Sequence, residues 1–223
     1  MKYIDKIKMI LEGIYDPHIF KAVIVVGSPA AGKSELSYKL KDTYGLKIID
    51  SDPALELLMD RAGLDLDMQN LTPDEHLKKD ALRDLAKNLR DKDLDLKLNN
   101  ALGIVYPTII DSEKIKSLKD SLENKGYETF LVFIDVPLHI AIERNNQRPR
   151  KVPENIVVER WKKSHEEYTK VADIFNSNIQ TIDGTKSPED YNLNRIREFL
   201  NSPVKNPKAQ NWINLQVQLK QSE

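Results

Sequence analysis

The chain has 223 residues, of which 40% are hydrophobic and 31% charged, and its formal net charge is −1. This length supports one well-buried core, and the balanced charge gives no overall basic field for wrapping a long nucleic acid. The absence of cysteine excludes disulfides, thiolate chemistry and cysteine-based zinc sites. The four histidines are scattered and do not have the spacing of metal ligands.

The first residues of the chain have the pattern of an amphipathic helix. In residues 1–16, MKYIDKIKMILEGIYD, charges alternate with a stripe of apolar side chains: Ile4, Ile7, Ile10, Leu11 and Ile14. Charges spread through this stretch argue against a signal peptide, and no run in the chain approaches the ~20 apolar residues that span a bilayer. We therefore expect an N-terminal helix over residues 1–20 and an intracellular protein without a membrane partner.

Five short apolar runs, rich in β-branched residues, predict buried strands that alternate with helices. The expected strands cover residues 21–26, 46–50, 102–106, 128–135 and 178–183. The expected helices cover residues 32–43, a short stretch opened by Pro53, 72–90, 112–125, a stretch opened by Pro137, 154–170 and 188–200. Residues 91–100 are polar and predict a loop, and residues 201–223 predict an extended tail.

Strands that alternate with helices imply parallel βαβ units, in which helices cover both faces of one sheet. We therefore expect an α/β fold with a five-stranded parallel sheet. The boundaries of the pattern predict a single domain over residues 21–200, preceded by the N-terminal helix and followed by the C-terminal tail over residues 201–223.

A phosphate-binding loop follows the first predicted strand. The run Gly27, Ser28, Pro29, Ala30, Ala31, Gly32, Lys33 and Ser34 fits the pattern G-x-x-x-x-G-K-[ST], between a strand and a helix as that motif requires. Backbone N–H groups and the positive end of the helix would bind the phosphates of a nucleotide donor. Lys33 would reach the β- and γ-phosphates, and Ser34 would hold Mg²⁺. A chance glycine-rich turn is the weaker interpretation.

Carboxylates follow the second and fourth predicted strands, where ligands of parallel sheets collect. Asp52 could accept the proton of an attacking hydroxyl or help to position Mg²⁺, but it could equally cap the helix that Pro53 opens. Asp50 is the less favoured base. Asp135 ends the fourth strand, and the proline two residues later favours a capping or structural role for it.

Two groups of basic residues stand out. Arg144 and Arg148 are four residues apart in a basic segment that continues to residue 151, so they could neutralise a transferring phosphoryl group from a closing lid. A solvated charged turn is the alternative. Arg83, Lys87 and Arg90 share one face of the helix over residues 72–90, where a solvated face is favoured over contact with an anionic acceptor.

These motifs resemble the kinase domain of phage polynucleotide kinase and are similar to zeta-toxin kinases and other phage-type P-loop kinases. The resemblance covers about residues 21–183. It rests on the phosphate loop, Asp52, Asp135-Val136-Pro137, Arg144-Asn145-Asn146-Gln147-Arg148 and Val152-Pro153. It implies the strand order 2-3-1-4-5, phosphate and Mg²⁺ binding by Lys33 and Ser34, and activation of the acceptor hydroxyl by Asp52. It also implies that Arg144 and Arg148, in a lid near residues 144–153, hold the phosphates of ATP.

The chain departs from this pattern at two places. Tyr106-Pro107-Thr108 ends the third strand where relatives carry an aspartate, and Ala54-Leu55 stands where polynucleotide kinases carry an arginine. We expect an ATP- and Mg²⁺-dependent kinase whose acceptor is a hydroxyl of a nucleic acid, a nucleotide or nucleoside, or a nucleotide sugar. The alternatives are a nucleotide-binding module without transferase activity and, less favoured, an ATPase motor.

Overall fold

The computed structural model describes residues 16–221. The helix expected over residues 1–20 lies outside the described residues, apart from residues 16–20, which form turns.

Five parallel strands form one sheet in the order β2-β3-β1-β4-β5. Their bounds are β1 Lys21–Gly27, β2 Lys47–Ile48, β3 Ile104–Thr108, β4 Glu128–Asp135 and β5 Ile179–Asp183. Every residue of β1 is buried, as the apolar run after Lys21 requires for a strand with both faces covered. The predicted α/β class and strand order are therefore confirmed.

Helices lie on both faces of this sheet. They are α2 Lys33–Tyr44, α3 Asp52–Arg61, α4 Pro73–Asn99, α5 Ser112–Asn124, α6 Leu138–Gln147, α7 Glu154–Phe175, the 3₁₀ turn η1 Pro188–Asp190, α8 Asn194–Asn201 and α9 Pro207–Gln221. Because successive strand residues point to opposite faces, Ala22, Ile24 and Val26 join one core cluster and Val23 and Val25 the other. The first cluster takes side chains from α5, α7 and α9, and the second from α2 and α8.

The loop expected over residues 91–100 is wrong, because α4 continues to Asn99. Leu94 and Leu98 are four residues apart and pack against the first core cluster, so one face of this polar stretch is anchored to the core. Its charged residues form the opposite, solvated face, where Lys97 pairs with Asp93. The predicted start of the helix is correct: Thr72 and Glu75 form a capping box.

The extended tail expected over residues 201–223 is also wrong for most of its length, because α9 covers Pro207–Gln221. Pro207 occupies the first position of the helix, where a proline costs no hydrogen bond. Ala209 is buried in the first core cluster, and the ring of Trp212 lies 5.3 Å from that of Phe20. The helix expected over residues 188–200 is split into η1 and α8.

Within residues 16–221, none of the helices combines the length and apolarity that crossing a bilayer needs.

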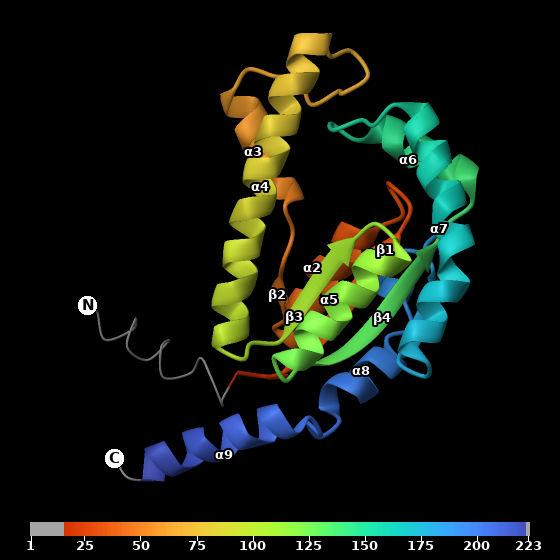
Figure 1. The fold of residues 1–223 in the computed structure, drawn as a ribbon. Helices are drawn as coiled ribbons and strands as arrows, with labels where there is room; N and C mark the ends of the chain where they lie inside the picture. Colours follow the sequence, from red (N-terminus) through yellow and green to blue (C-terminus); the bar gives the residue numbers. More distant parts are fainter. Residues whose placement is uncertain (1–15, 222–223) are drawn as a thin grey trace.

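Beyond the carboxyl ends of the strands the fold opens into two walls (Figure 1). On one side α3 packs against α4 through a small apolar cluster that includes Leu55, Met59 and Ala86. On the other side stand α6 and α7, which pack against each other. The phosphate loop lies at the base of this arrangement, between β1 and α2.

A buried ion pair joins β1 to β4, and a hydrogen bond from the same lysine joins β1 to the segment after α8. The Nζ atom of Lys21, whose side chain is 1% exposed, lies 2.5 Å from a carboxylate oxygen of Glu128 and 2.8 Å from Oγ of Ser202. We expect Glu128→Ala to lower the free energy of unfolding by about 3–5 kcal/mol, because it leaves a buried charge unpaired. Urea denaturation measures this loss.

The matched control for this prediction is Lys21→Met, which removes the buried charge and fills similar space. Lys21→Met should lower the free energy of unfolding clearly less than Glu128→Ala does. A loss below about 1 kcal/mol for Glu128→Ala would contradict the assignment of a stabilising role to this pair.

Candidate active site

A cavity of about 1080 Å³ lies at the carboxyl ends of the strands, between the two walls. Its lining comes from the phosphate loop, the start of α3, one face of α4, the end of β3 and the segment from α6 into α7. Ligands of open parallel sheets bind at this edge, so the fold alone makes this cavity the candidate site.

The phosphate loop has the backbone geometry that its glycines allow. A Cβ atom at Gly27 would lie 2.8 Å from the carbonyl oxygen of Ile134, so only glycine lets the loop approach β4 this closely. Gly32, which precedes α2, has a φ of 105°, in the left-handed region that favours glycine. Residues 29–34 line the cavity, whereas Ser28 is buried beneath it.

Lys33 lies folded over this loop. Its Nζ donates hydrogen bonds to the carbonyl oxygens of Gly27, at 3.1 Å, and Ser28, at 2.7 Å. Burial lowers the pKa of Lys33 from 10.5 to about 8; the positive charge of Arg148 adds to this effect and the carboxylate of Asp52 opposes it. An anion bound at the loop would favour the charged ammonium, as the predicted contact with donor phosphates requires.

This pKa predicts a pH dependence for nucleotide binding. Below pH 8 the ammonium of Lys33 is charged and attracts phosphates; above pH 8 the free protein loses that proton, and binding must restore it. We expect the Kd for ATP to be nearly constant from pH 6.5 to about 8 and then to rise by up to about tenfold per pH unit. Calorimetric titration across pH 6.5–9.5 measures it, and a constant Kd up to pH 9.5 would contradict this role of Lys33.

The oxygen atoms around the loop fit a Mg²⁺ ion that arrives with a nucleotide. Oγ of Ser34 forms no hydrogen bond with any of residues 16–221, and the carboxylates of Asp50 and Asp52 line the same cavity. Among the described residues no group of three or more acidic or histidine side chains could hold a metal alone. Mg²⁺ needs no such cage, since substrate phosphates and waters complete its shell.

Asp52 does not cap α3, which removes the alternative interpretation of this residue. It is the first residue of that helix, and its backbone N–H donates to the carboxylate of Asp50 at 3.0 Å. Asp50 therefore takes the capping contact, and burial raises its pKa. The carboxylate of Asp52 instead accepts a hydrogen bond from the guanidinium of Arg150 and lines the cavity. Its role as the base remains a prediction.

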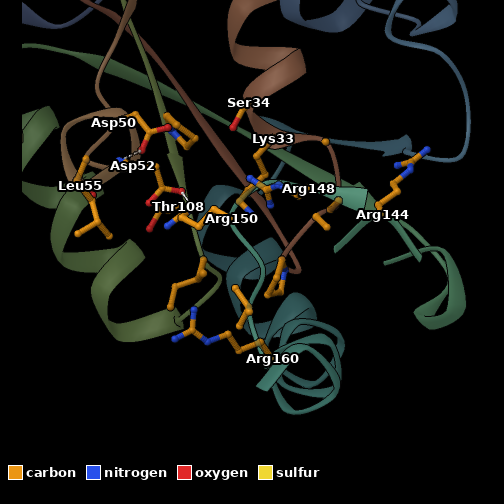
Figure 2. Close-up of a pocket in the computed structure, with 18 of the residues that line it drawn as sticks. Lys33, Ser34, Asp50, Asp52, Leu55, Thr108, Arg144, Arg148, Arg150 and Arg160 are labelled. Carbon is orange, nitrogen blue, oxygen red and sulfur yellow. Dashed lines mark hydrogen bonds and ion pairs between the residues drawn. The ribbon is translucent and has the colours of Figure 1, made fainter. Parts of the chain in front are cut away.

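Arg150 is a site residue that the sequence placed in the basic segment of Arg144, Arg148, Arg150 and Lys151 without giving it a role of its own. Its guanidinium bonds Asp52, and its Nε lies 2.9 Å from a carboxylate oxygen of Glu56, one turn further along α3. Figure 2 shows this arginine pointing toward Asp52. The basic segment contained the signal, but its partner lies 98 residues earlier in the chain.

The two predicted lid arginines line the cavity at different places. Arg148 lies beside Lys33 and lowers its pKa, and the guanidinium of Arg148 makes no hydrogen bond or ion pair within residues 16–221. Arg144 donates to the carbonyl oxygen of Gly184, in the loop after β5, at 2.8 Å. In Figure 2 Arg144 lies on the far side of Lys33 from Asp52. Phosphate binding by either arginine remains a prediction.

Asp135 has a structural contact, in agreement with the favoured interpretation, although it caps no helix. Its carboxylate lies 3.0 Å from Nε2 of His165 on α7, and the residue is not part of the cavity lining. Nearby, Nε1 of Trp161 donates to the carbonyl oxygen of Val136 at 2.8 Å. These contacts attach α7 to the end of β4.

The side chains of Arg83, Lys87 and Arg90 all line the cavity, although that of Lys87 is 47% exposed. Each also pairs with an acidic residue of its own helix, and Arg90 lies over the ring of Tyr106, 5.5 Å from its centroid. The favoured solvated face and the contact with an anionic acceptor both stay predictions. Sequence alone could not place residues 144–160 on the opposite wall of the cavity.

Comparisons with solved structures agree with the fold. Deoxyadenosine kinase from M. mycoides, with bound dATP, superposes with a TM-score of 0.50 at 16% identity over 81% of this chain and 99% of its own. A putative kinase from Chloroflexus aurantiacus gives a TM-score of 0.51 at 15% identity over 82% and 94% of the two chains. The architecture is therefore that of P-loop kinases.

Sequence comparisons add the family. Thymidylate kinase from Fervidobacterium nodosum is 31% identical over 87 residues, or 39% of this chain, and the match spans less than half of that relative's length, 44%. The zeta toxin family model matches residues 14–195, which is well over half of the chain, and this match confirms the resemblance to zeta-toxin kinases. The protein therefore belongs to the zeta toxin family.

Proposed function

We propose that the protein is an ATP-dependent kinase that transfers the γ-phosphoryl group to a hydroxyl of a nucleotide or a related small molecule. One observation carries this proposal: a single cavity is lined both by the phosphate loop, with Lys33 and Ser34, and by the carboxylate of Asp52. Phosphoryl transfer needs these two components side by side, a cationic cradle for the donor and an acceptor for the hydroxyl proton. The family and the fold support the same class of reaction.

In the proposed reaction the acceptor oxygen forms a bond to the γ-phosphorus while the bond from that phosphorus to the β–γ bridging oxygen breaks, which releases ADP. Lys33, Arg148 and the N-terminus of α2 neutralise the charge on the phosphates. Asp52 takes the proton of the hydroxyl, after its carboxylate exchanges the guanidinium of Arg150 for the acceptor. Ser34 would help to hold Mg²⁺, which would supply further neutralisation of the phosphate charge when bound.

The test is transfer of label from ATP carrying radioactive γ-phosphate, with Mg²⁺, to a panel of acceptors. The panel contains 5′-hydroxyl oligonucleotides, DNA with hydroxymethylated bases, nucleosides, nucleoside monophosphates and UDP-sugars. We expect label in one class of acceptor and none with Lys33→Ala. Tight ATP binding without label in any acceptor would contradict the proposal.

That negative outcome would favour a nucleotide-binding module without transferase activity. Two observations motivate this second candidate. β3 ends in Thr108, so no carboxylate stands at the end of this strand, and the carboxylate of Asp52 is already engaged by Arg150.

A further inference from the structure

Three guanidinium groups from three different elements meet in the cavity. Arg83 comes from α4, Arg150 from the segment between α6 and α7, and Arg160 from α7, and all three line the cavity. In Figure 2 Arg160 lies on the side of Arg150 away from Ser34. Such convergence of like charges is unfavourable unless something negative compensates for it.

Within the described part of the chain, the three arginines differ in how many carboxylate partners they have. Arg150 has two carboxylate partners, Asp52 and Glu56. Arg83 has one contact, 3.4 Å to the carboxylate of Asp80, and that same oxygen lies 3.1 Å from Nζ of Lys79. A single carboxylate therefore serves two cations on this wall of the cavity.

Arg160 has no compensation of this kind. Its guanidinium forms no hydrogen bond or ion pair with any of residues 16–221. Burial, followed by the nearby charge of Arg83, lowers the pKa of Arg160 from its ordinary value; the carboxylates of Glu159 and Asp52 oppose this effect and Arg150 adds to it. The guanidinium therefore has acidic residues in its surroundings, but none of them is in direct contact with it within the described residues.

We propose that Arg83 and Arg160 bind a phosphate group that the acceptor itself carries, so that the substrate is a phosphorylated small molecule and not a neutral nucleoside or sugar. This inference rests on the proposed function, because it assumes that the reacting hydroxyl lies at Asp52. Guanidinium groups that approach from different elements suit a tetrahedral phosphate, whose oxygens point in several directions, better than a planar carboxylate.

The donor does not need these two arginines. Its phosphates already have Lys33, the N-terminus of α2 and Arg148, although the charge of Arg160 also reaches Lys33 and lowers its pKa. Arg83 belongs instead to the wall that α4 forms with α3, the helix that begins at Asp52. One pair of packed helices therefore carries the predicted base and one of the two predicted phosphate contacts, and α7 supplies the other.

The size of the cavity is consistent with two ligands. Small-molecule sites commonly measure about 300–1,000 Å³, and this cavity, at about 1080 Å³, is slightly larger than that range. Lys79, Lys87 and Arg90 extend the basic wall along α4, beyond Arg83. A phosphorylated acceptor could therefore lie along α4 with its hydroxyl toward the phosphate loop.

The test uses pairs of compounds that differ only in their phosphates. Nucleosides are compared with their 5′-monophosphates, and free sugars with UDP-sugars, by calorimetric titration of the protein with Mg²⁺ and a non-hydrolysable ATP analogue in the donor site. The two sets of pairs distinguish a nucleotide from a nucleotide sugar. The variants are Arg83→Gln and Arg160→Gln, and their matched controls are Lys92→Gln on α4 and Lys162→Gln on α7, both exposed and outside the cavity lining.

We expect the phosphorylated member of one pair to bind at least about tenfold more tightly than its counterpart, as charge-assisted hydrogen bonds predict. Each glutamine variant should reduce this advantage about tenfold, and both controls should keep it. In transfer assays the same variants should raise KM for the acceptor and change kcat by less than about threefold.

Equal binding within every pair, no binding by any phosphorylated compound, or an advantage that both glutamine variants retain would overturn the inference. Its failure is distinguishable from that of the proposed function. Transfer of label to a neutral acceptor would support the proposed kinase activity and contradict the phosphate site. If the phosphorylated compound binds more tightly, the variants abolish this difference and no label is transferred, the phosphate site is supported and the kinase activity is contradicted.

Discussion

Asp52→Asn is expected to lower kcat for phosphoryl transfer by about 10²–10⁴-fold and to leave the Kd for ATP within about threefold of that of the unaltered protein. The amide has the shape of the carboxylate but cannot accept the proton of the acceptor hydroxyl. The backbone should be undisturbed, because the contact at the start of α3 is made by the carboxylate of Asp50 and the N–H of residue 52. Steady-state label transfer, together with calorimetric titration of ATP, separates the two effects.

Glu56→Gln is the matched control for this prediction. It removes the second carboxylate on Arg150, whose Nε lies 2.9 Å from Glu56, and leaves Asp52 in place. If both variants lost activity equally, the relevant property would be the position of Arg150 and not proton acceptance. Full activity in Asp52→Asn would show that the assigned base is wrong.

Lys33→Met is expected to lower kcat by about 10²–10³-fold and to weaken ATP binding, because one charged donor to the transferring phosphoryl group is lost. The same change should keep or raise the melting temperature. At pH 7 the native protein holds the ammonium of Lys33 in a site where burial lowers its pKa to about 8, and methionine removes that cost. If Lys33→Met loses activity but keeps its stability, Lys33 serves the function of the protein and not the stability of its fold.

The control for this prediction is Lys41→Met, in the last turn of the same helix, where the side chain is exposed and outside the cavity. It should change neither activity nor melting temperature. A large fall in the melting temperature of Lys33→Met would mean that the two hydrogen bonds to the loop carbonyls stabilise the fold more than the burial of charge costs it.

The sequence was sufficient for features that depend on local pattern. The apolar run that became β1, the glycines of the loop and the capping box of α4 each fix a backbone conformation through residues close in the chain. The strand order came from the family resemblance. Lys33 and Ser34 lie at the cavity because they belong to the motif that defines it.

Contacts between residues that are far apart in the chain could not be predicted from the sequence. Nothing local indicates that Arg150 bonds a carboxylate 98 residues earlier, or that the basic face of α4 turns toward α7. The two errors in secondary structure have the same origin. The polar stretch that ends α4 and the tail that became α9 are helical because Leu98 and Ala209 reach a core built by other segments.

The central claim is that donor and acceptor meet in one cavity, with Asp52 at the point of transfer. The most direct measurement is a crystal structure of the protein with Mg²⁺, a non-hydrolysable ATP analogue and the acceptor that the transfer assay identifies. We predict that the γ-phosphorus and the acceptor hydroxyl lie about 3–3.5 Å apart, with that hydroxyl within hydrogen-bonding distance of Asp52. A nucleotide bound away from residues 27–34, or an acceptor hydroxyl remote from Asp52, would contradict the account.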